Sequence, residues 1–411
     1  MNVVIFEDKK VENLFPLTHL RPVFELKSGI FSLLEKAQKA IPFGVTHFWV
    51  REELAEFVRE KYPNIKVNES VQGETFFLNA KILADKLYID IGKDEFRTDS
   101  EGELLCAYLN LQNQISKIEE VPQIQEKTLE LKLINYSWDL INHNASEIER
   151  EAKEFPLGEV QSKLYPNVSL VEADKIFIGK NCTVKPGVVL DATHGAIVID
   201  EGVEIFPNSV IEGPCYVGKN SKIKSGAKIY EGTSIGEVCK VGGEVEEAII
   251  HAYSNKQHDG FLGHSYLAEW VNLGADTNTS DLKNDYGNVK VQVNGRNIDS
   301  GSQFVGLTMG DHSKSAINTQ FNTGTVVGIS SNIFGANFPP KFIPSFAWGG
   351  SEKLIEHQLT KALKTAKIVM SRRKVEMSEA YEKLFTGTFE STSDLREKTF
   401  KKLERLSKKQ I

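Results

Sequence analysis

Residues 199–245 read IDEGVEIFPNSVIEGPCYVGKNSKIKSGAKIYEGTSIGEVCKVGGEV. Every sixth residue of this stretch is a β-branched aliphatic, namely Ile199, Ile205, Ile211, Val217, Ile223, Ile229, Ile235 and Val241. The residue four positions after each of them is small or Val, as at Ser209, Ala227 and Thr233. A strict period of six matches neither an α-helix nor an ordinary long strand. It predicts a parallel β-helix of hexapeptides, in which three short strands make one triangular turn around the aliphatic side chains.

The same period continues less regularly on both sides of this stretch. It begins near Ile178, shifts register at residues 193–196, and is interrupted at residues 251–260 and again around residues 289–295. In the second interruption alternating valines precede Asn294-Gly295, which is typical of a β-hairpin turn. The ladder returns from Met309 to Ile333, and Phe346-Ala-Trp348 is expected to cap the open end of the prism. We therefore predict a β-helical domain over residues 166–350.

The rest of the chain has helical and mixed patterns. Apolar runs predict strands at residues 3–6, 46–50 and 75–78, and amphipathic spacing predicts helices at 30–41 and 52–62. This alternation indicates a small Rossmann-like α/β domain with a parallel sheet over residues 1–100. Residues 101–165 are expected to bridge the domains, with a strand at 129–134 and a helix at 138–155. Residues 351–411 are expected to form C-terminal helices, one from Ser351 to about Lys374, whereas the basic tail 398–409 is expected to be a solvated terminus.

Composition excludes several classes of protein. A net charge of −7 at pH 7 argues against nucleic acid as the main partner. The chain has no apolar run of about eighteen residues and no signal-like N-terminus, so we expect no membrane partner. Of its four cysteines, Cys182, Cys215 and Cys239 occupy the small position of a hexapeptide. That placement favours small buried side chains over disulfides or metal ligands, and it suits a reducing cytoplasm.

Functional residues are expected where the ladder is interrupted, because loops on a rigid scaffold commonly carry sites. Residues 253–264 bring together Lys256, His258, Asp259 and His264, and Val271-Asn-Leu-Gly-Ala-Asp-Thr277 follows. A His with Gly five positions on, followed by Val-Asn-(Ile/Phe)-Gly-Ala-Gly-Thr, is the motif of a known family. The chain resembles, over about residues 170–350, the acetyltransferase domain of bifunctional enzymes that make UDP-N-acetylglucosamine, especially the archaeal and Bacteroidetes-type branch.

This resemblance implies an acetyltransferase with a left-handed β-helix, assembled as a homotrimer. His258 would be the general base that deprotonates the amine of a hexosamine 1-phosphate as it attacks acetyl-CoA. Substrate contacts would come from Lys256, Asn272 and Lys283, and the backbone of Gly274 and Ala275 would contact the coenzyme. Arg372, Arg373 and Lys374 would either meet the phosphates of the coenzyme or form a charged helix face. This sequence has Asp276 where the family has Gly, and Phe261 where the family has Tyr. Because of these two differences, the resemblance does not identify the acceptor sugar.

The N-terminal domain resembles sugar nucleotidyltransferases more distantly. The same branch has a shortened N-terminal domain with Pro-Leu-Thr-x-x-Arg-Pro, present here from Pro16 to Pro22. Arg21 and Lys27 would then bind the phosphates of a nucleoside triphosphate, with Arg21 as a brace of its own loop as the alternative. The chain has no glycine before Gly29 to form a phosphate-binding loop, and Asn79 replaces a metal-binding Asp. Mg²⁺ is therefore expected only if this domain is active.

Two further functions remain open at this point. The β-helix would serve as a non-catalytic or regulatory scaffold if it has no affinity for coenzyme. Alternatively His251, His258 and His264 would hold zinc, as in a related class of β-helical carbonic anhydrases. That class lacks the Asn-Leu-Gly-Ala element, so the preferred hypothesis is acetyl transfer to a hexosamine 1-phosphate, with nucleotidyl transfer in the N-terminal domain as a possible second step.

Overall fold

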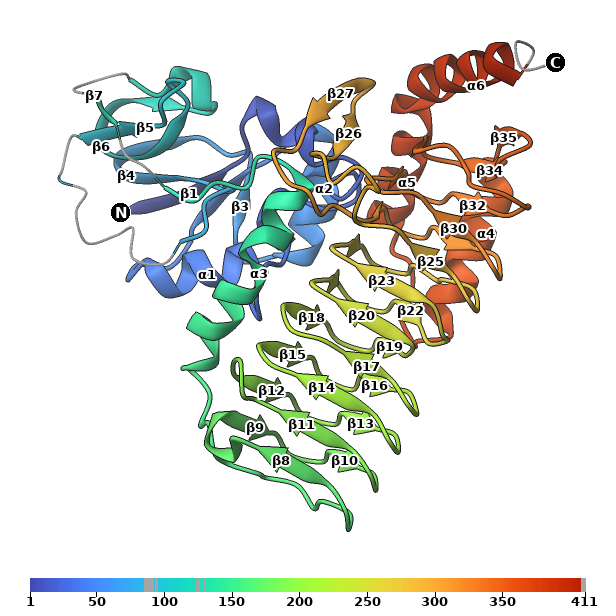
Figure 1. The fold of residues 1–411 in the computed structure, drawn as a ribbon. Coiled ribbons are helices and arrows are strands. Elements are labelled where there is room, and N and C mark those ends of the chain that lie inside the picture. The colour runs from blue at the N-terminus through green and yellow to red at the C-terminus, as the bar shows by residue number, and fades with distance from the viewer. Residues whose placement is uncertain (85–91, 93–94, 123–125, 129–130, 408–411) are drawn as a thin grey trace.

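The computed structural model describes residues 1–84, 92, 95–122, 126–128 and 131–407. An N-terminal α/β domain leads through a long helix into a β-helix, and three helices follow at the C-terminus (Figure 1). Residues 169–349 form stacked coils of short parallel strands, so the predicted fold class is confirmed as an α/β domain, a left-handed parallel β-helix and C-terminal helices. Within the described residues, no helix is long and apolar enough to cross a membrane.

The N-terminal domain is built on one seven-stranded sheet with the order β3-β2-β1-β4-β6-β5-β7. Its strands are β1 Asn2–Phe6, β2 His47–Trp49, β3 Lys66–Val67, β4 Val71–Asn79, β5 Glu95–Thr98, β6 Leu104–Ile115 and β7 Glu126–Thr128. The first four strands are parallel, as the strand–helix alternation predicts, and β6 is antiparallel to β4 and β5. Its helical segments are η1 Lys9–Leu14, η2 Val23–Glu25, α1 Leu33–Ala40, α2 Glu52–Lys61 and, after β6, η3 Ile118–Glu120.

The sheet does not end at residue 100. Strand β6 lies inside it, so a large part of the expected bridging segment belongs to the N-terminal sheet. The strand predicted at residues 129–134 falls partly on residues 129–130, which lie outside the described residues. Its remaining residues contribute one isolated antiparallel bridge, between Leu133 and Ile82. The apolar run there reflects burial of Ile134 in a coil and does not indicate a strand.

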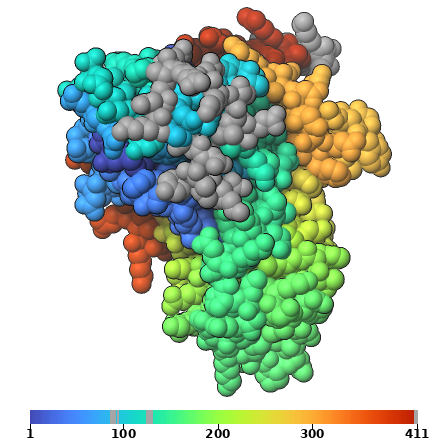
Figure 2. Space-filling view, turned by 90° about the vertical axis from the view of Figure 1, so that its left-hand side faces the viewer, coloured from blue at the N-terminus to red at the C-terminus, as the bar shows by residue number. Residues whose placement is uncertain are grey.

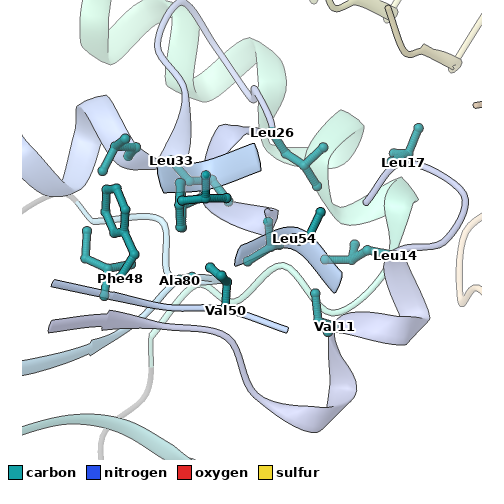
Figure 3. Close-up of a cluster of buried hydrophobic side chains, with 14 of the residues drawn as sticks. Val11, Leu14, Leu17, Leu26, Leu33, Phe48, Val50, Leu54 and Ala80 are labelled. Carbon is teal, nitrogen blue, oxygen red and sulfur yellow. The ribbon is translucent and has the colours of Figure 1, made fainter. Parts of the chain in front are cut away.

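Alternate residues of β1 enter two different cores, as expected for a strand buried on both faces. Val3 and Ile5 join the core under α1 and α2, whereas Val4 and Phe6 join a second core on the opposite face of the sheet, together with buried residues of β6. Figure 3 shows the first core, where Leu33 of α1, Leu54 of α2 and Phe48 of β2 converge over the sheet. Each such buried side chain contributes on the order of 1.5–3 kcal/mol of burial free energy. The same core continues through buried residues of the β-helix and the C-terminal helices, so the domains share one interior.

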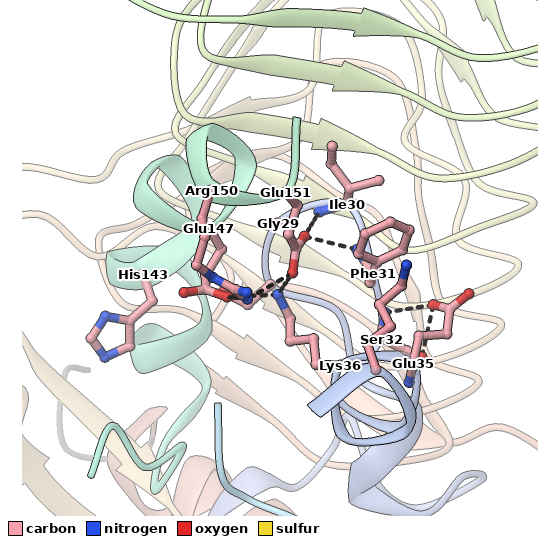
Figure 4. A network of polar contacts seen from close by, with 12 residues as sticks. Gly29, Ile30, Phe31, Ser32, Glu35, Lys36, His143, Glu147, Arg150 and Glu151 are labelled. Carbon is pink, nitrogen blue, oxygen red and sulfur yellow. Dashed lines mark hydrogen bonds and ion pairs between the residues drawn. The ribbon is translucent and has the colours of Figure 1, made fainter. Parts of the chain in front are cut away.

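Helix α3, Ser137–Ala152, joins the N-terminal domain to the β-helix and is fastened by a buried polar network (Figure 4). Lys36 Nζ donates to Glu147 Oε2 at 2.7 Å and is also paired with Glu151. Glu151 Oε2 in turn accepts the backbone N–H of Ile30 at 2.7 Å and that of Phe31 at 3.1 Å. All three charged side chains are buried, so each depends on its partners to offset desolvation. This network fixes α3 against the loop before α1.

The β-helix is a stack of triangular coils whose three sides are parallel sheets. The first side contains β8 Ser169–Val171, β11 Val189–Asp191, β14 Val210–Glu212, β17 Lys228–Ile229, β20 Glu244–Glu246 and β23 Phe261–Gly263. The second contains β9 Ile176–Ile178, β12 Ile197–Ile199, β15 Cys215–Val217, β18 Thr233–Ile235, β21 Ile249–Ile250, β24 Tyr266–Leu267, β28 Thr308–Met309, β31 Val326–Val327 and β33 Phe342–Ile343. Between β8 and β9 lies a short helix, η4 Ala173–Lys175.

The third side is assembled from two sheets and isolated bridges. Its strands are β10 Thr183–Val184, β13 Glu204–Ile205, β16 Lys222–Ile223, β19 Lys240–Val241, β22 Asn255–Lys256, β29 Lys314–Ser315, β32 Asn332–Ile333 and β34 Ala347–Gly349. Asn272 bridges Asn255 below it and Lys314 above it, which makes this side continuous. Two further strands, β25 Asn278–Thr279 and β30 Gln320–Phe321, pair with each other above β23. Figure 2 shows the first coils projecting below the N-terminal domain.

The predicted aliphatic ladder is the interior of the prism. Ile199, Ile205, Ile211 and their successors to Val241 are fully buried. The four cysteines are free thiols and all are buried, as the hexapeptide positions of three of them predict. The interruption predicted at residues 251–260 is wrong, because β22 continues the stack on β19 with Lys256 opposite Val241. Backbone pairing requires no particular side chain, so the coil persists although Lys256 replaces an aliphatic residue.

The second predicted interruption is confirmed as a hairpin that leaves the prism. Its strands are β26 Lys290–Val293 and β27 Arg296–Asp299, paired antiparallel around Asn294-Gly295. At the C-terminal end of the prism, β35 Leu354–Glu356 pairs antiparallel with β34. Helix α4 therefore begins at Leu359, not at Ser351, and runs to Ser371. It is followed by α5 Glu379–Ser391 and α6 Ser393–Ser407, so the basic tail is largely helical.

The predicted cap of the prism is formed by Phe346. This side chain is fully buried and packs edge-on against Phe385 and Phe389 of α5, whereas Trp348 is 40% exposed. Helix α5 also contacts α2 of the N-terminal domain, where the rings of Tyr381 and Phe57 lie 5.2 Å apart. The C-terminal helices therefore connect the end of the prism to the first domain.

A buried ion pair crosses the interface between the N-terminal domain and the β-helix. Both guanidinium Nη atoms of Arg21 donate to the carboxylate of Asp311, Nη1 at 3.3 Å from Oδ2. Nη2 also lies 3.3 Å from Oε2 of Glu269. Arg21 is 3% exposed and Asp311 is fully buried, so each needs the other to avoid an unpaired buried charge.

Replacing Arg21 with Met is expected to destabilise the chain by about 3–5 kcal/mol, because it leaves the Asp311 carboxylate buried without a counter-charge. The double variant Arg21→Met/Asp311→Asn should recover much of that loss, since Asn removes the charge and still accepts the backbone N–H of Glu269. Urea denaturation of the wild type, Arg21→Met, Asp311→Asn and the double variant measures the coupling free energy between the two side chains. Equal losses in Arg21→Met and in the double variant would contradict this assignment.

Candidate functional site

Four successive coils form one edge of the prism around His258. We call this edge the His258 corner and define it by residues 257–260, 274–276, 316–318 and 334–335. Its coils are joined by backbone hydrogen bonds, from Asp276 N to Asp259 O at 3.1 Å and from Asn318 N to Ala275 O at 2.8 Å. Ile317, on the coil above Ala275, is 69% exposed. The corner therefore presents the predicted base, the predicted coenzyme contacts and an apolar side chain along one line.

His258 occupies the turn between β22 and β23, and its side chain is exposed. Among the described residues, none forms a hydrogen bond with its imidazole. Its backbone is held in place, because its carbonyl accepts a hydrogen bond from Lys256 Nζ at 2.7 Å. An imidazole on a fixed backbone with both ring nitrogens open to a ligand suits a general base.

Lys256 was predicted to bind substrate, but the structure places it inside the wall of the prism. It is 2% exposed, and its ammonium lies beneath the His258 corner. Burial lowers the pKa of Lys256 to about 8, an effect that the nearby carboxylates of Asp259 and Asp276 oppose. This location favours a role in holding the His258 turn over direct contact with a sugar phosphate.

Gly274 and Ala275 lie on the coil directly above His258. A Cβ at Gly274 would lie 2.4 Å from the backbone of Ala316, so only glycine allows the coils to stack this closely. The N–H of Gly274 donates to Ser315 O, whereas the N–H of Ala275 has no hydrogen-bond partner among the described residues. The Ala275 amide is therefore free to donate to a ligand carbonyl. Asp276 takes a positive φ of 58°, a conformation that Asp tolerates, so the replaced glycine does not disrupt the turn.

The remaining predicted substrate residues are separated from one another. Asn272 lies on the third side of the prism, where its Oδ1 is 3.3 Å from Asn255 Nδ2 and where it lines a cleft beside Gln257. Lys283 lies beyond the far end of β25, and its Nζ is paired with Asp285 at 3.1 Å. The structure thus groups His258, Gly274 and Ala275 at one corner, places Asn272 beside it, and puts Lys283 in the excursion after Asp281.

The structure also contains a His–Asp pair that no sequence motif indicates. His264 Nδ1 lies 2.8 Å from Asp281 Oδ2, and its ring stacks on Phe304 with centroids 4.9 Å apart. The two residues are seventeen positions apart on consecutive coils, a proximity that hexapeptide spacing alone does not reveal. His251 is instead buried, with Nδ1 2.9 Å from the Tyr266 hydroxyl. Of the three histidines of the zinc hypothesis, His251 and His264 are each bound to a different side chain, and no group of three or more metal-ligating side chains occurs within the described part of the chain.

The N-terminal domain has its own cleft at the carboxyl ends of β1 and β2. This is the usual ligand position in an open α/β sheet. The cleft has a volume of about 620 Å³, and its lining includes Glu7, Asp8, Lys9, Arg51, Asn68 and Lys117. Arg51 Nε donates to Glu7 Oε2 at 3.1 Å, which fixes the guanidinium at the cleft wall. The sequence offers one signal for this cleft, which is that some of its residues directly follow predicted strands.

Neither predicted nucleotide ligand lines this cleft. Arg21 is committed to Asp311 at the domain interface, which favours the alternative that it braces the structure. The backbone N–H of Lys27 donates to the Tyr266 hydroxyl at 3.1 Å, which places Lys27 at the same interface.

Asn79 stands where the resemblance places a metal-binding Asp, and the nearby carboxylate of Asp8 already has partners. Asp8 Oδ2 accepts from Asn79 Nδ2 and from Lys81 Nζ, each at 2.8 Å. Asn79 offers a neutral amide, and Lys81, which is 2% exposed, already neutralises Asp8. This arrangement does not fit a metal held by Asp8 and residue 79, and we derive no step through Mg²⁺.

Two family matches correspond to the two domains. Residues 3–158 match the sugar nucleotidyl transferase family, and residues 196–231 match the bacterial transferase hexapeptide, six repeats. A bifunctional sugar-1-phosphate nucleotidylyltransferase/acetyltransferase of Sulfurisphaera tokodaii is 29% identical over 295 residues, which cover 64% of this chain and 72% of that protein. The bifunctional protein GlmU of Marinobacter nauticus is 34% identical over 123 residues, covering 29% of this chain and 26% of that protein.

Among solved structures, a UDP-N-acetylglucosamine acyltransferase is similar to 52% of this chain, at 18% identity and a TM-score of 0.26, and the match covers 81% of that chain. The chain spans less than half of the GlmU proteins that it matches, from 23% to 44% of their length. Both domains are transferase domains by these matches.

The buried ammonium of Lys256 makes a prediction about pH. The pKa of Lys256 is about 8 in the folded chain and near 10.5 in the unfolded chain. At pH values between these two, the unfolded chain therefore binds one more proton than the folded chain does. The free energy of unfolding should therefore rise with pH from about 8 to 10, by up to about 1.4 kcal/mol per pH unit from this group.

Urea denaturation at several pH values should show a smaller rise in Lys256→Met than in the wild type. The exposed Lys180 provides the control, since Lys180→Met should keep the wild-type slope. Identical slopes in wild type and Lys256→Met would contradict the burial of the ammonium.

Proposed function

We propose that the β-helix transfers an acetyl group from acetyl-CoA to the amine of a hexosamine 1-phosphate, a reaction in keeping with the similarity of this chain to a bifunctional sugar-1-phosphate nucleotidylyltransferase/acetyltransferase. The observation that carries the proposal is the His258 corner. There His258, whose side chain is exposed, lies one coil below Ala275, whose N–H has no hydrogen-bond partner among the described residues. Rigid backbone elements hold reacting groups within the small tolerance that acyl transfer requires.

In the proposed reaction the amine nitrogen of the sugar attacks the thioester carbonyl carbon. His258 accepts the proton that the nitrogen loses, a role suited to a neutral imidazole near physiological pH. The Ala275 N–H donates a hydrogen bond to the carbonyl oxygen as negative charge develops on it. Collapse of the tetrahedral intermediate breaks the C–S bond, and the departing sulfur takes up the proton that His258 accepted. The products are the N-acetylated sugar phosphate and the thiol of coenzyme A, with His258 neutral again.

The corner is open on its outer side. Ile317 and Phe334, on the coils above Ala275, are 69% and 39% exposed. A second copy of the chain at this edge, as in the homotrimer that the proposal includes, would cover these side chains and enclose the thioester. Exclusion of water in this way strengthens the hydrogen bonds that stabilise the developing charge.

His258→Ala is expected to lower kcat for acetyl transfer by about 100-fold or more, because it removes the general base. Thiol release from acetyl-CoA in the presence of glucosamine 1-phosphate and related amino-sugar phosphates measures the rate. His194 is also exposed, so His194→Ala is the matched control and should keep wild-type activity. Full activity in His258→Ala, or no thiol release by the wild type with any of these acceptors, would remove the proposal. A scaffold without catalysis would show no affinity for coenzyme by calorimetry.

A second activity, nucleotidyl transfer to a sugar 1-phosphate, is favoured by the family match over residues 3–158 and by the N-terminal cleft. In that reaction a phosphate oxygen of the sugar 1-phosphate attacks the α-phosphorus of a nucleoside triphosphate and displaces pyrophosphate. Lys9 and Lys117 line the cleft, and Lys9 Nζ lies 3.3 Å from Glu119 Oε1, a partner that a triphosphate would replace as it binds the two ammonium groups.

Lys9→Gln/Lys117→Gln is therefore expected to raise the KM for the triphosphate by about tenfold, in keeping with the loss of charged hydrogen bonds. Pyrophosphate release with each of the four common ribonucleoside triphosphates provides the measurement. Lys66 is exposed on β3 and does not line the cleft, so Lys66→Gln should behave as wild type. No pyrophosphate release with any triphosphate would exclude this activity and leave acetyl transfer unaffected.

A further inference from the structure

A second cleft lies between α4 and the third side of the β-helix. We call it the α4 cleft. It has a volume of about 340 Å³ and is lined by Lys240, Tyr253, Asn255, Gln257, Trp270, Val271, Asn272, Lys314, Val369, Arg372 and Arg373. Its inner wall is the outward-facing column of Lys240, Asn255, Asn272 and Lys314 on consecutive coils. Its outer wall is the C-terminal end of α4. Gln257 connects the cleft to the His258 corner.

The charge in this cleft has one sign. Four cationic side chains line it, from Lys240, Lys314, Arg372 and Arg373, and its lining contains no carboxylate among the described residues. Lys314 Nζ donates to the carbonyl of His312 at 2.8 Å, and Arg373 Nη2 donates to Asn255 Oδ1 at 2.9 Å, so both contacts are with neutral acceptors. Within the described part of the chain, none of the four has a carboxylate within ion-pair distance.

Mutual repulsion and burial both act on these cations. Burial lowers the pKa of Lys314 to about 8. The pKa of Lys240 is lowered by burial and by the charges of Arg373, Lys222, Lys224 and Arg372. The carbonyl groups at the C-terminus of α4 favour cations there, but a helix end supplies only about half a negative charge. Lys240 and Lys314, on the opposite wall, have no negative charge beside them among the described residues. The cleft therefore favours an anionic ligand.

One wall of the cleft is aromatic. The rings of Tyr253 and Trp270 are stacked with centroids 4.4 Å apart, and Val369 of α4 faces the same space. The amides of Asn255, Asn272 and Gln257 add neutral donors and acceptors for hydroxyl groups. A cationic centre flanked by amides and an aromatic surface fits a phosphate attached to a polar organic group better than a free inorganic ion.

We propose that the α4 cleft binds the phosphate of an organic phosphate ester, with Arg372, Arg373, Lys240 and Lys314 as its cationic ligands. The site goes beyond the proposed acetyl transfer, which requires a phosphorylated ligand but assigns no place to its phosphate. Which ester binds rests on the proposed function. The phosphate of a hexosamine 1-phosphate and the phosphates of coenzyme A share this chemistry, and both would approach His258 past Gln257.

The test is calorimetric titration of the full-length protein with glucosamine 1-phosphate, coenzyme A, 3′-dephospho-coenzyme A and inorganic phosphate. Arg372→Gln/Arg373→Gln is expected to weaken at least one of the two natural esters by about tenfold or more, the effect of losing charged hydrogen bonds. Lys364 is exposed on the same helix outside the cleft, so Lys364→Gln is the control for loss of one helix charge and should bind as wild type.

The pattern of losses identifies the source of the phosphate. If the double variant binds glucosamine 1-phosphate more weakly than the wild type does, the cleft holds the phosphate of the acceptor sugar. If it binds coenzyme A more weakly but 3′-dephospho-coenzyme A almost as well as the wild type does, the cleft holds the 3′-phosphate of the coenzyme. If the affinity for both forms of the coenzyme falls equally, the cleft holds the diphosphate of the coenzyme. Wild-type affinity of the double variant for every probe, or inorganic phosphate bound as tightly as either ester, would overturn the proposal.

Stability measurements separate this site from a merely structural cluster. Arg372 makes no side-chain hydrogen bond or ion pair with any described residue, so Arg372→Gln should not lower the melting temperature in phosphate-free buffer. It should instead raise that temperature slightly, because it relieves repulsion, and it should reduce the rise that the ester produces in the wild type. A large loss of stability without ligand would contradict the proposed site. If acetyl transfer depends on His258 but ester binding is unchanged in the double variant, this inference fails and the proposed function stands.

Discussion

Parallel backbone pairing between consecutive coils is the constraint on which this structure depends. Each coil places its aliphatic residues over those of the coil below, as Ile199, Val217 and Ile235 do, and the corners consequently line up along the prism. His258, Ala275 and Ile317 are brought to one edge by this stacking and not by a local motif. A hydrophobic column of this kind gains stability only when several coils stack, because each added coil buries the exposed face of its neighbour. The same rigidity keeps the backbone of His258 and the amide of Ala275 at a fixed separation.

The N-terminal domain is attached to this prism by polar as well as apolar contacts. Arg21 reaches Asp311 across the interface, and the apolar core runs without a break from α1 and α2 to Phe346 and α5. Buried ion pairs specify one geometry at some cost in stability, so this pair selects the relative placement of the two domains more than it strengthens the fold. The element from Pro16 to Pro22 therefore serves the interface. The cleft at the carboxyl ends of β1 and β2 is therefore where we expect ligands of the first domain to bind.

The sequence predicted regular features better than contacts between distant residues. The six-residue period located the prism, its interior and the buried cysteines, because the period is a direct consequence of coil geometry. It failed at residues 251–260, where Lys256 occupies an interior position that the pattern reserves for aliphatic residues. A lysine can do so because its stem is apolar and its ammonium finds the His258 carbonyl. The His264–Asp281 pair and the α4 cleft were missed because each joins residues from separate coils or from a helix far along the chain.

The central claim is that the open corner at His258 is where acetyl-CoA reacts. The most direct measurement is a crystal structure of the protein with coenzyme A soaked into the crystals. We predict that the thiol end of the pantetheine arm lies beside the His258 imidazole, with the neighbouring carbonyl within hydrogen-bond distance of the Ala275 N–H. A coenzyme bound with its thiol away from this corner, or a His258 ring sealed from it by another part of the assembly, would contradict the account.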